Sequence, residues 1–227
     1  MTDIIKKLLF PQKCKCCFQL CEKDNLCKKC REKLSLLKIQ NPDRTSEKKI
    51  DFVDSLYSSY YYRDEARDVV LNAKYKDMSS FINSLQKDIS GDIETIYSAN
   101  QIDLVLSVPY HKSKLYGTEH DLPFEMAKVI SKMTGVPHIQ CVEKTVKTKS
   151  QHKLDKSARK ANLINAFTVT ENVEGKNILI VDDVVTSGAT LSVIAAELKI
   201  AQCNKIIAYT YTFNEEREKT KWHQEMK

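Results

Sequence analysis

The segment ILIVDDVVTSGATL, residues 178 to 191, constrains the fold of this chain more than any other stretch. Its first four residues are apolar and indicate a short buried strand, which two adjacent carboxylates, Asp182 and Asp183, follow. Small and hydroxyl-bearing residues then lead into a sequence that predicts a helix beginning near Leu191. A strand that only packs in a core has no need to end on two negative charges. The segment therefore predicts a ligand site where a strand gives way to a helix.

The two parts of this turn suit different parts of a phosphorylated sugar. The carboxylates of Asp182 and Asp183 can accept hydrogen bonds from ribose hydroxyls and can hold a hydrated Mg²⁺. The run from Thr186 to Thr190 offers backbone N–H groups, hydroxyls and a helix N-terminus, and Gly188 lets a ligand come close, which are the features of a phosphate cradle. No Gly-Lys-Ser/Thr sequence is present, so this is not a Walker loop. Alternatively, Asp183 or Thr186 only caps the helix, which would explain one polar residue but not the whole arrangement.

Alternating strand and helix patterns predict an α/β fold around this turn. Over 102–213 the order strand, helix, strand, helix, strand predicts a parallel sheet with crossover helices. In chain order, the patterns predict a strand within 52–62, helices within 63–78 and 81–98, a strand from 102 to Pro109, a helix over 122–134, a strand over 178–182, a helix over 190–201 and a strand over 205–213.

Six of the eight cysteines lie between residues 14 and 30, in two Cys-x-x-Cys pairs with nine residues between them. Four thiolates so spaced can close tetrahedrally on a structural Zn²⁺, which leaves no open position for catalysis. The predicted ligands are Cys14, Cys17, Cys27 and Cys30. Either Cys16 or Cys21 is an alternative to Cys17, and reduced cysteines without a metal are the other interpretation. We expect a reducing compartment because the chain has no convincing export signal, and this favours a metal site over disulfides.

Positive charge is concentrated in two segments of the chain. The formal net charge is +6, and residues 1–49 hold thirteen Lys and Arg against six Asp and Glu. The segment 144–160 carries seven basic residues and one acidic residue and has no apolar period, so we expect a mobile basic loop there. Two basic segments suggest two places that meet anions, although a solvated lysine-rich surface would have the same composition.

The sequence predicts one main domain with a small N-terminal module. We expect a four-cysteine zinc module over 1–45, a ligand-binding α/β domain over 46–215 and a polar tail over 216–227. No apolar run approaches the ~20 residues that a membrane span needs, so we expect a cytoplasmic protein without a span.

The segment at 178–191 resembles the phosphoribosyl pyrophosphate (PRPP) motif of type I phosphoribosyltransferases at every position. The chain as a whole resembles the ComF family, competence-associated phosphoribosyltransferase-like proteins with an N-terminal four-cysteine zinc module. The resemblance covers roughly residues 14–213. It also involves the cysteine pairs, KYKD at 74–77, VPYHK at 108–112, and a loop with Gln151, Leu154, Arg159, Asn162 and Phe167.

The resemblance implies a type I phosphoribosyltransferase fold and a set of PRPP contacts. Asp182 and Asp183 would bind the ribose hydroxyls and Mg²⁺ as the catalytic pair, and the basic segment would close over PRPP as a hood. The implied contacts with the phosphates are Val185, Thr186, Ser187, Gly188, Ala189 and Thr190 for the 5-phosphate, Pro109, Tyr110, His111 and Lys112 for the pyrophosphate, and Lys149, Gln151 and Arg159 from the hood.

One departure from the family pattern affects the expected chemistry. ComF proteins usually carry an Arg-Gly-Phe-Asn-Gln segment before the next helix, whereas this chain reads YGTEHDLPFEMA from residue 116, with Glu119 and Asp121 and no arginine. A missing charge-assisted hydrogen bond of about 1.5 to 3 kcal/mol would weaken PRPP binding or stabilisation of the leaving group. PRPP binding is therefore better supported than turnover.

Three functions follow from the sequence and the resemblance. The first is an enzyme that transfers a phosphoribosyl group from PRPP to an amine or base. The second is a PRPP-binding module that acts in DNA uptake, as natural transformation is the process to which the family is tied. The third is a zinc-containing adaptor that binds single-stranded DNA or a helicase partner through the basic N-terminal module. In the third case, affinity for DNA should fall steeply with salt.

Overall fold

The structure, a computed structural model, describes residues 13–14, 16–21, 26–75, 78–109, 120–144 and 166–215. Its centre is a four-stranded sheet with the strand order β1-β6-β5-β2, in which every neighbouring pair is parallel. The strands are β1 (Ser55–Tyr61), β2 (Leu104–Ser107), β5 (Asn177–Val185) and β6 (Lys205–Phe213). The predicted α/β fold with a parallel sheet is confirmed.

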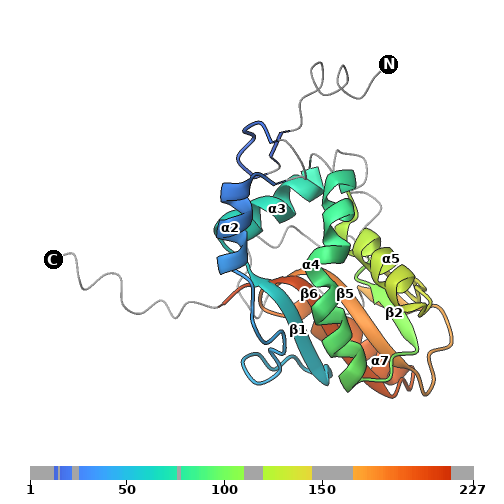
Figure 1. The fold of residues 1–227 in the computed structure, drawn as a ribbon. Helices are drawn as coiled ribbons and strands as arrows, with labels where there is room; N and C mark the ends of the chain where they lie inside the picture. The colour runs from blue at the N-terminus through green and yellow to red at the C-terminus, as the bar shows by residue number, and fades with distance from the viewer. Residues whose placement is uncertain are drawn as a thin grey trace, which may run out of the picture.

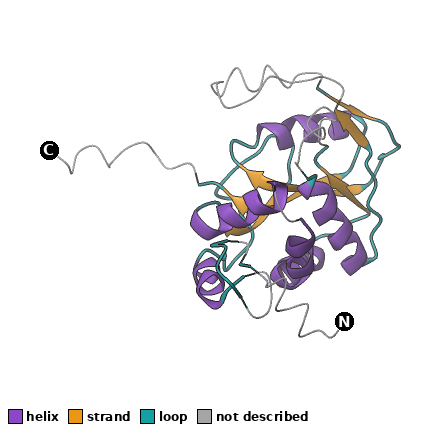
Figure 2. Ribbon diagram, turned by 90° about the horizontal axis from the view of Figure 1, so that it is seen from above, coloured by secondary structure: helices purple, strands orange, loops and turns teal. Residues whose placement is uncertain are grey.

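Helices cover both faces of this sheet, as Figure 2 shows from above. The helices α3 (Asp64–Tyr75), α4 (Met78–Ala99) and α5 (Leu122–Thr134) pack on one face, and α7 (Ala189–Ile200) packs on the other. Side chains alternate along β5 between these two cores. Leu179 and Val181 join the core under α3, α4 and α5, while Ile178 and Ile180 join the core under α7.

Strand β5 is longer than the sequence predicts, and this changes the place of the acidic pair. The prediction ended the strand at Asp182, but β5 continues to Val185 because it stays paired with β6 as far as Phe213. Asp182 and Asp183 therefore lie within the strand and not after it, which corrects the expectation. Pairing with β2 does stop at Val181, so both aspartates extend beyond the end of that neighbouring strand.

A second, two-stranded sheet was not predicted. Its strands β3 (Val142–Lys144) and β4 (Phe167–Val169) run antiparallel, with Lys144 opposite Phe167. Lys144 was expected to begin the basic loop, and it belongs to a strand instead. The remainder of that segment, from residue 145 onwards, lies outside the described residues. The small sheet thus contains Lys144, the first residue of the segment that the resemblance assigns to the hood.

The helix that follows the second cysteine pair, α2 (Lys28–Leu36), lies against α3 beyond one end of the sheet (Figure 1). An ion pair of 2.7 Å joins Lys33 Nζ to Glu65 Oε1 between the two helices. After α2 the chain runs antiparallel to β1, with bridges from Lys38 to Tyr60 and from Asp43 to Tyr57. The division of the chain at residue 45 stays a prediction, as does the tail, which lies outside the described residues.

None of the helices in the described residues is long and apolar enough to cross a membrane.

Candidate functional site

The acidic pair on β5 meets a lysine from another part of the chain. Asp183 lies on the face of β5 that α3 covers, and its carboxylate Oδ2 pairs with Lys74 Nζ near the end of that helix. The Asp183 side chain is 8% exposed and that of Lys74 is 20% exposed, so the pair is largely shielded from water. Thr212 on β6 donates its hydroxyl to the backbone carbonyl of Asp183 at 2.9 Å. The geometry fixes Asp183 from two sides.

Among the residues that the structure describes, none forms an ion pair with Asp182. Its Oδ1 accepts the backbone N–H of Asp183 at 2.9 Å. Burial and the negative charge of Asp183 raise the pKa of Asp182 to about 8, although Lys74 opposes the shift. Burial alone would lower the pKa of Lys74, but the charges of Asp183 and Asp182 raise it overall. A cation bound beside Asp182 would favour its ionised form.

The chain after β5 forms a turn that leads into the N-terminus of α7. Gly188 is the N-cap residue, with a φ of 77°, and it provides no side-chain cap for the helix. The first N–H groups of α7 have no partner within the helix and point outwards with its positive dipole end. Ser187 Oγ is 3.4 Å from the N–H of Ala189, while Thr186 is exposed and Thr190 half-buried. These groups are arranged as a phosphate would require.

A residue far away in sequence packs against this turn. A Cβ at Gly188 would lie 2.8 Å from Ile50 Cγ1 and 2.9 Å from Ile50 Cδ1, so the isoleucine fills the space that any other residue would need. Ile50 is itself buried. The segment after α2 thus forms one wall of the turn and fixes the position of its backbone.

The N-terminus of α5 borders the acidic pair. Asp121 caps this helix by accepting the backbone N–H of Phe124 at 3.1 Å, and the backbone N–H of His120 donates to the carbonyl of Lys74 at 2.8 Å. Burial raises the pKa of Asp121, and the nearby charge of Asp183 adds to the shift. The segment that departs from the family pattern therefore brings a third carboxylate towards the site and pins the end of α3. Glu119 lies outside the described residues.

The end of β2 is tied to the small sheet by a glutamine. Ser107 donates its hydroxyl to Gln140 Oε1 at 2.6 Å, and Gln140 Nε2 donates to the carbonyl oxygens of Ser107 and Val142 at 3.0 and 3.1 Å. Pro109 follows two residues later and is half-buried. The other residues expected to contact the pyrophosphate, or to contact PRPP from the hood, lie outside the described residues; they are Tyr110, His111, Lys112, Lys149, Gln151 and Arg159.

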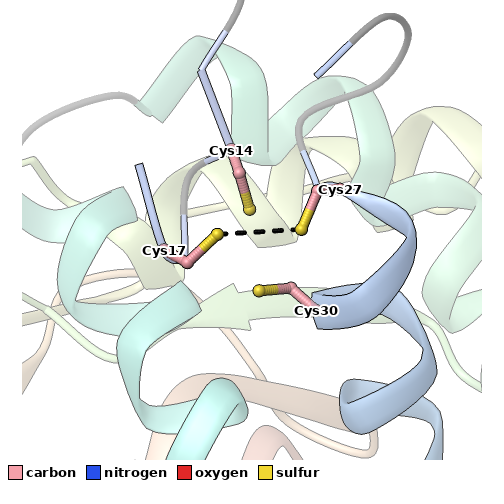
Figure 3. Close-up of side chains that lie close together, drawn as sticks. All are labelled: Cys14, Cys17, Cys27 and Cys30. Atoms are coloured by element: carbon pink, nitrogen blue, oxygen red, sulfur yellow. Dashed lines mark hydrogen bonds between the residues drawn. The ribbon is translucent and has the colours of Figure 1, made fainter. Parts of the chain in front are cut away.

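The four cysteines predicted to bind zinc come together in space. Figure 3 shows their sulfur atoms pointing towards one another, and all four lie within 4.8 Å of each other. The sulfurs of Cys17 and Cys27 are 3.7 Å apart, close to the ~3.8 Å edge of a tetrahedron with Zn–S bonds of about 2.3 Å. Cys16 and Cys21 are not part of this cluster. The donor set and its spacing fit a closed zinc site.

Local backbone geometry explains how the cluster forms. Lys13 and Leu20 pair as an antiparallel bridge, so the first cysteine pair lies in a tight turn. Cys27 precedes the first residue of α2, and Cys30 lies in the first turn of this helix. Burial would raise the pKa of the Cys14 thiol, yet hydrogen bonds from the backbone at Cys17, Cys27 and Cys16 lower it to about 6. A thiolate at this position is what a metal requires.

Comparison with known proteins finds similarity over parts of the chain. Residues 123–226 match the phosphoribosyl transferase domain family. Over 56 residues the chain is 46% identical to the DNA utilization protein YhgH of Escherichia coli strain K12, a match that covers 25% of each chain. Over 135 residues it is 26% identical to the competence protein ComFC of Bacillus subtilis strain 168, covering 59% of this chain and 53% of the relative. Together these matches support a ComF-family phosphoribosyltransferase-like protein.

The matched part of this chain spans a quarter of YhgH and about half of ComFC. Among solved structures, a hypoxanthine phosphoribosyltransferase from Staphylococcus aureus is 15% identical to this chain, with a TM-score of 0.40. The match covers 67% of this chain and 75% of that enzyme chain. The chain has the type I phosphoribosyltransferase fold, with four clustered cysteines near its N-terminus.

Sequence reasoning assigned no role to three residues of this candidate site. Lys74 belongs to the KYKD stretch, which carried the resemblance but no predicted contact. Asp121 was considered only as part of a segment without its arginine, and it proves to cap α5. No sequence pattern indicates a role for Ile50, because its contact with Gly188 joins positions 138 residues apart. For Asp121 the signal was present, since an aspartate before Leu-Pro is a typical start of a helix.

Proposed function

We propose that this ComF-family chain binds PRPP together with Mg²⁺ at the end of strand β5. The observation that carries the proposal is the continuity of two elements: a strand with one half-buried and one buried carboxylate leads in a few residues to the open N-terminus of α7. The spacing suits a ribose whose hydroxyls and 5-phosphate are bound by neighbouring groups. The match of residues 123–226 to phosphoribosyl transferase domains supports the same ligand.

Each part of PRPP would meet a different part of the chain. Asp182 and Asp183 would hold the ribose hydroxyls and Mg²⁺, which prefers carboxylate oxygens and keeps several waters. Residues 185–190 would bind the 5-phosphate through backbone N–H groups and hydroxyls. The chain from Pro109 to Lys112 would bind the pyrophosphate, and Lys149, Gln151 and Arg159 would close over it.

Phosphoribosyl transfer is a further part of the proposal. Bound Mg²⁺ would stabilise negative charge on the departing pyrophosphate. The chain's own contribution would be to hold the ribose at Asp182 and Asp183 and to exclude water. The acidic segment that includes Asp121 would bring negative charge near a departing anion, which needs cations. PRPP binding is therefore better supported than turnover.

The names of the relatives suggest the process in which PRPP binding would be used. Because the relatives are a competence protein and a DNA utilization protein, we infer a role in DNA uptake. A second candidate is an adaptor that binds single-stranded DNA or a helicase through the cysteine cluster. Lys13, Lys28 and Lys29 are exposed around the cluster and support this alternative. Zn²⁺ would be structural in both cases, since four cysteines fill its coordination shell.

Titration calorimetry with PRPP and Mg²⁺ tests the first proposal. We expect saturable heat from the zinc-replete protein and its loss in Asp183→Asn, which keeps the shape of the side chain but removes the charge. Lys128→Asn, an exposed change on α5, is the matched control and should bind as the unaltered protein does. An absence of heat in the unaltered protein would contradict PRPP binding.

A short single-stranded oligonucleotide tests the adaptor alternative in the same instrument. DNA binding through the cysteine module should weaken steeply as salt rises, because neutralised phosphates release counterions. Replacing Lys13, Lys28 and Lys29 should flatten this dependence and leave PRPP binding intact. Binding that is insensitive to both salt and these lysines would exclude the module as the DNA contact.

A further inference from the structure

Lys74 is the cation nearest to the acidic pair among the described residues that form ion pairs. It reaches Asp183 from the end of α3, and its backbone carbonyl accepts the N–H of His120, so the segment before α5 pins the end of α3. Helix α3 and the end of β5 both lie on the core face that Leu179 and Val181 occupy. The fold therefore holds the ammonium group in place at the carboxylate and does not leave it on a free surface chain.

Three carboxyl groups lie near this lysine. Asp182 and Asp183 are adjacent on β5, and Asp121 caps the start of α5 close enough to act on Asp183. A buried ion pair is weak evidence for stability, because removing both charges from water costs about as much as their attraction returns. A shielded Lys–Asp pair on a signature carboxylate thus points to a role in ligand binding.

We propose that Lys74 is a positioning residue that occupies, in the ligand-free protein, the cation position on Asp183, so that divalent metal enters together with PRPP and not before it. The inference rests on the proposed function. An ammonium group and a divalent metal compete for the same carboxylate oxygens, and a metal arriving alone would meet the positive charge of Lys74. A metal that arrives with PRPP brings phosphate oxygens, to which Lys74 can turn when it leaves Asp183.

Two measurements on Lys74→Met separate this role from a structural one. The first is the affinity of the zinc-replete protein for Mn²⁺ alone, which electron paramagnetic resonance measures from the signal of the free ion. The second is binding of PRPP in the presence of Mg²⁺, followed by calorimetry. Close charge pairs couple strongly enough that we expect Mn²⁺ alone to bind at least about tenfold more tightly in Lys74→Met. We expect PRPP to bind at least about tenfold more weakly, because its phosphates lose a cation.

Two further variants control the experiment. Lys74→Arg keeps a cation in place and should restore weak Mn²⁺ binding. Lys128→Met removes an exposed lysine that pairs with Glu125 at 3.1 Å on α5, and it should change neither affinity. If Lys74→Met does not fold, Lys74→Gln keeps a hydrogen-bond donor of similar length and takes its place in both measurements.

The opposite signs of the two changes decide the outcome. The inference is overturned if folded Lys74→Met protein binds Mn²⁺ no more tightly than the unaltered protein does. It is also overturned if the variant loses affinity for both Mn²⁺ and PRPP. If the unaltered protein binds no PRPP, the proposed function fails, and the Mn²⁺ measurement alone still decides whether Lys74 excludes the metal. The two failures are therefore distinguishable.

Discussion

Gly188 shows at the residue scale how the turn between β5 and α7 depends on one missing side chain. Its φ of 77° strains any other residue, and a Cβ would press on Ile50. Gly175 is the matched control, since its φ is 67° but a Cβ there would meet open space. We expect Gly175→Ala to lower the free energy of unfolding by about 1 kcal/mol, and Gly188→Ala to lower it by about 1–3 kcal/mol more. Urea denaturation measures both, and equal losses would show that the Ile50 contact is unimportant.

Asp182 gives a prediction about pH at the same scale. Its pKa in the folded protein is about 8, above the ordinary value of 3.8, because of burial and Asp183. The folded state thus binds the proton more tightly than the unfolded state does, so this group lowers stability progressively as pH rises from about 4 to about 8. Asp182→Asn removes that penalty. Without added Mg²⁺, we expect its gain in melting temperature to grow from pH 5 to pH 8; a gain that is the same at every pH would contradict the assignment.

At the scale of elements, one largely buried ion pair joins the segment after α2 to helix α4. Lys38 Nζ pairs with Asp92 on α4, and Asp92 also accepts the hydroxyl of Ser59 on β1. The Asp92 side chain is 7% exposed, so it depends on these donors. Lys38→Met leaves a buried charge without its cation and should lower the free energy of unfolding by about 3–5 kcal/mol.

The exposed pair between α2 and α3 is the control for this prediction. Lys33→Met breaks the ion pair with Glu65, in which the lysine side chain is 52% exposed. We expect a much smaller loss of stability there, since water screens such pairs. If the denaturation curves of the two variants coincide, the contact between α4 and the segment after α2 is not a main source of stability.

Elements with clear end signals could be predicted, and elements held by distant partners could not. The predicted bounds of α5 match at both ends, because Asp121 caps its start and Gly135, with a φ of 74°, ends it. Strand β5 exceeds its prediction because pairing with β6, and not local pattern, decides where it ends. The three-residue strands β3 and β4 are too short to show a hydrophobic period in the sequence. The Lys74–Asp183 pair could not be predicted either, because it depends on how α3 crosses the sheet.

At the scale of the whole molecule, the cysteine cluster should decide how much of the N-terminal segment is ordered. The described residues between 13 and 21 bury few side chains, and a zinc site can supply about 10 kcal/mol or more to such a segment. We expect one zinc per chain by elemental analysis, and Cys17→Ser should lose this metal and unfold at lower temperature. Cys21→Ser should keep it, since its sulfur is outside the cluster. Zinc retained in Cys17→Ser with loss in Cys21→Ser would reverse the assignment.

The central claim is that the end of β5 and the start of α7 hold a ribose and its phosphate. A crystal structure of the zinc-replete protein with PRPP and Mn²⁺, located by anomalous scattering, tests it most directly. The account predicts the 5-phosphate within hydrogen-bond distance of backbone N–H groups between Thr186 and Thr190, and the metal and ribose hydroxyls at Asp182 and Asp183. Clear density for PRPP elsewhere, with this turn empty, would contradict it.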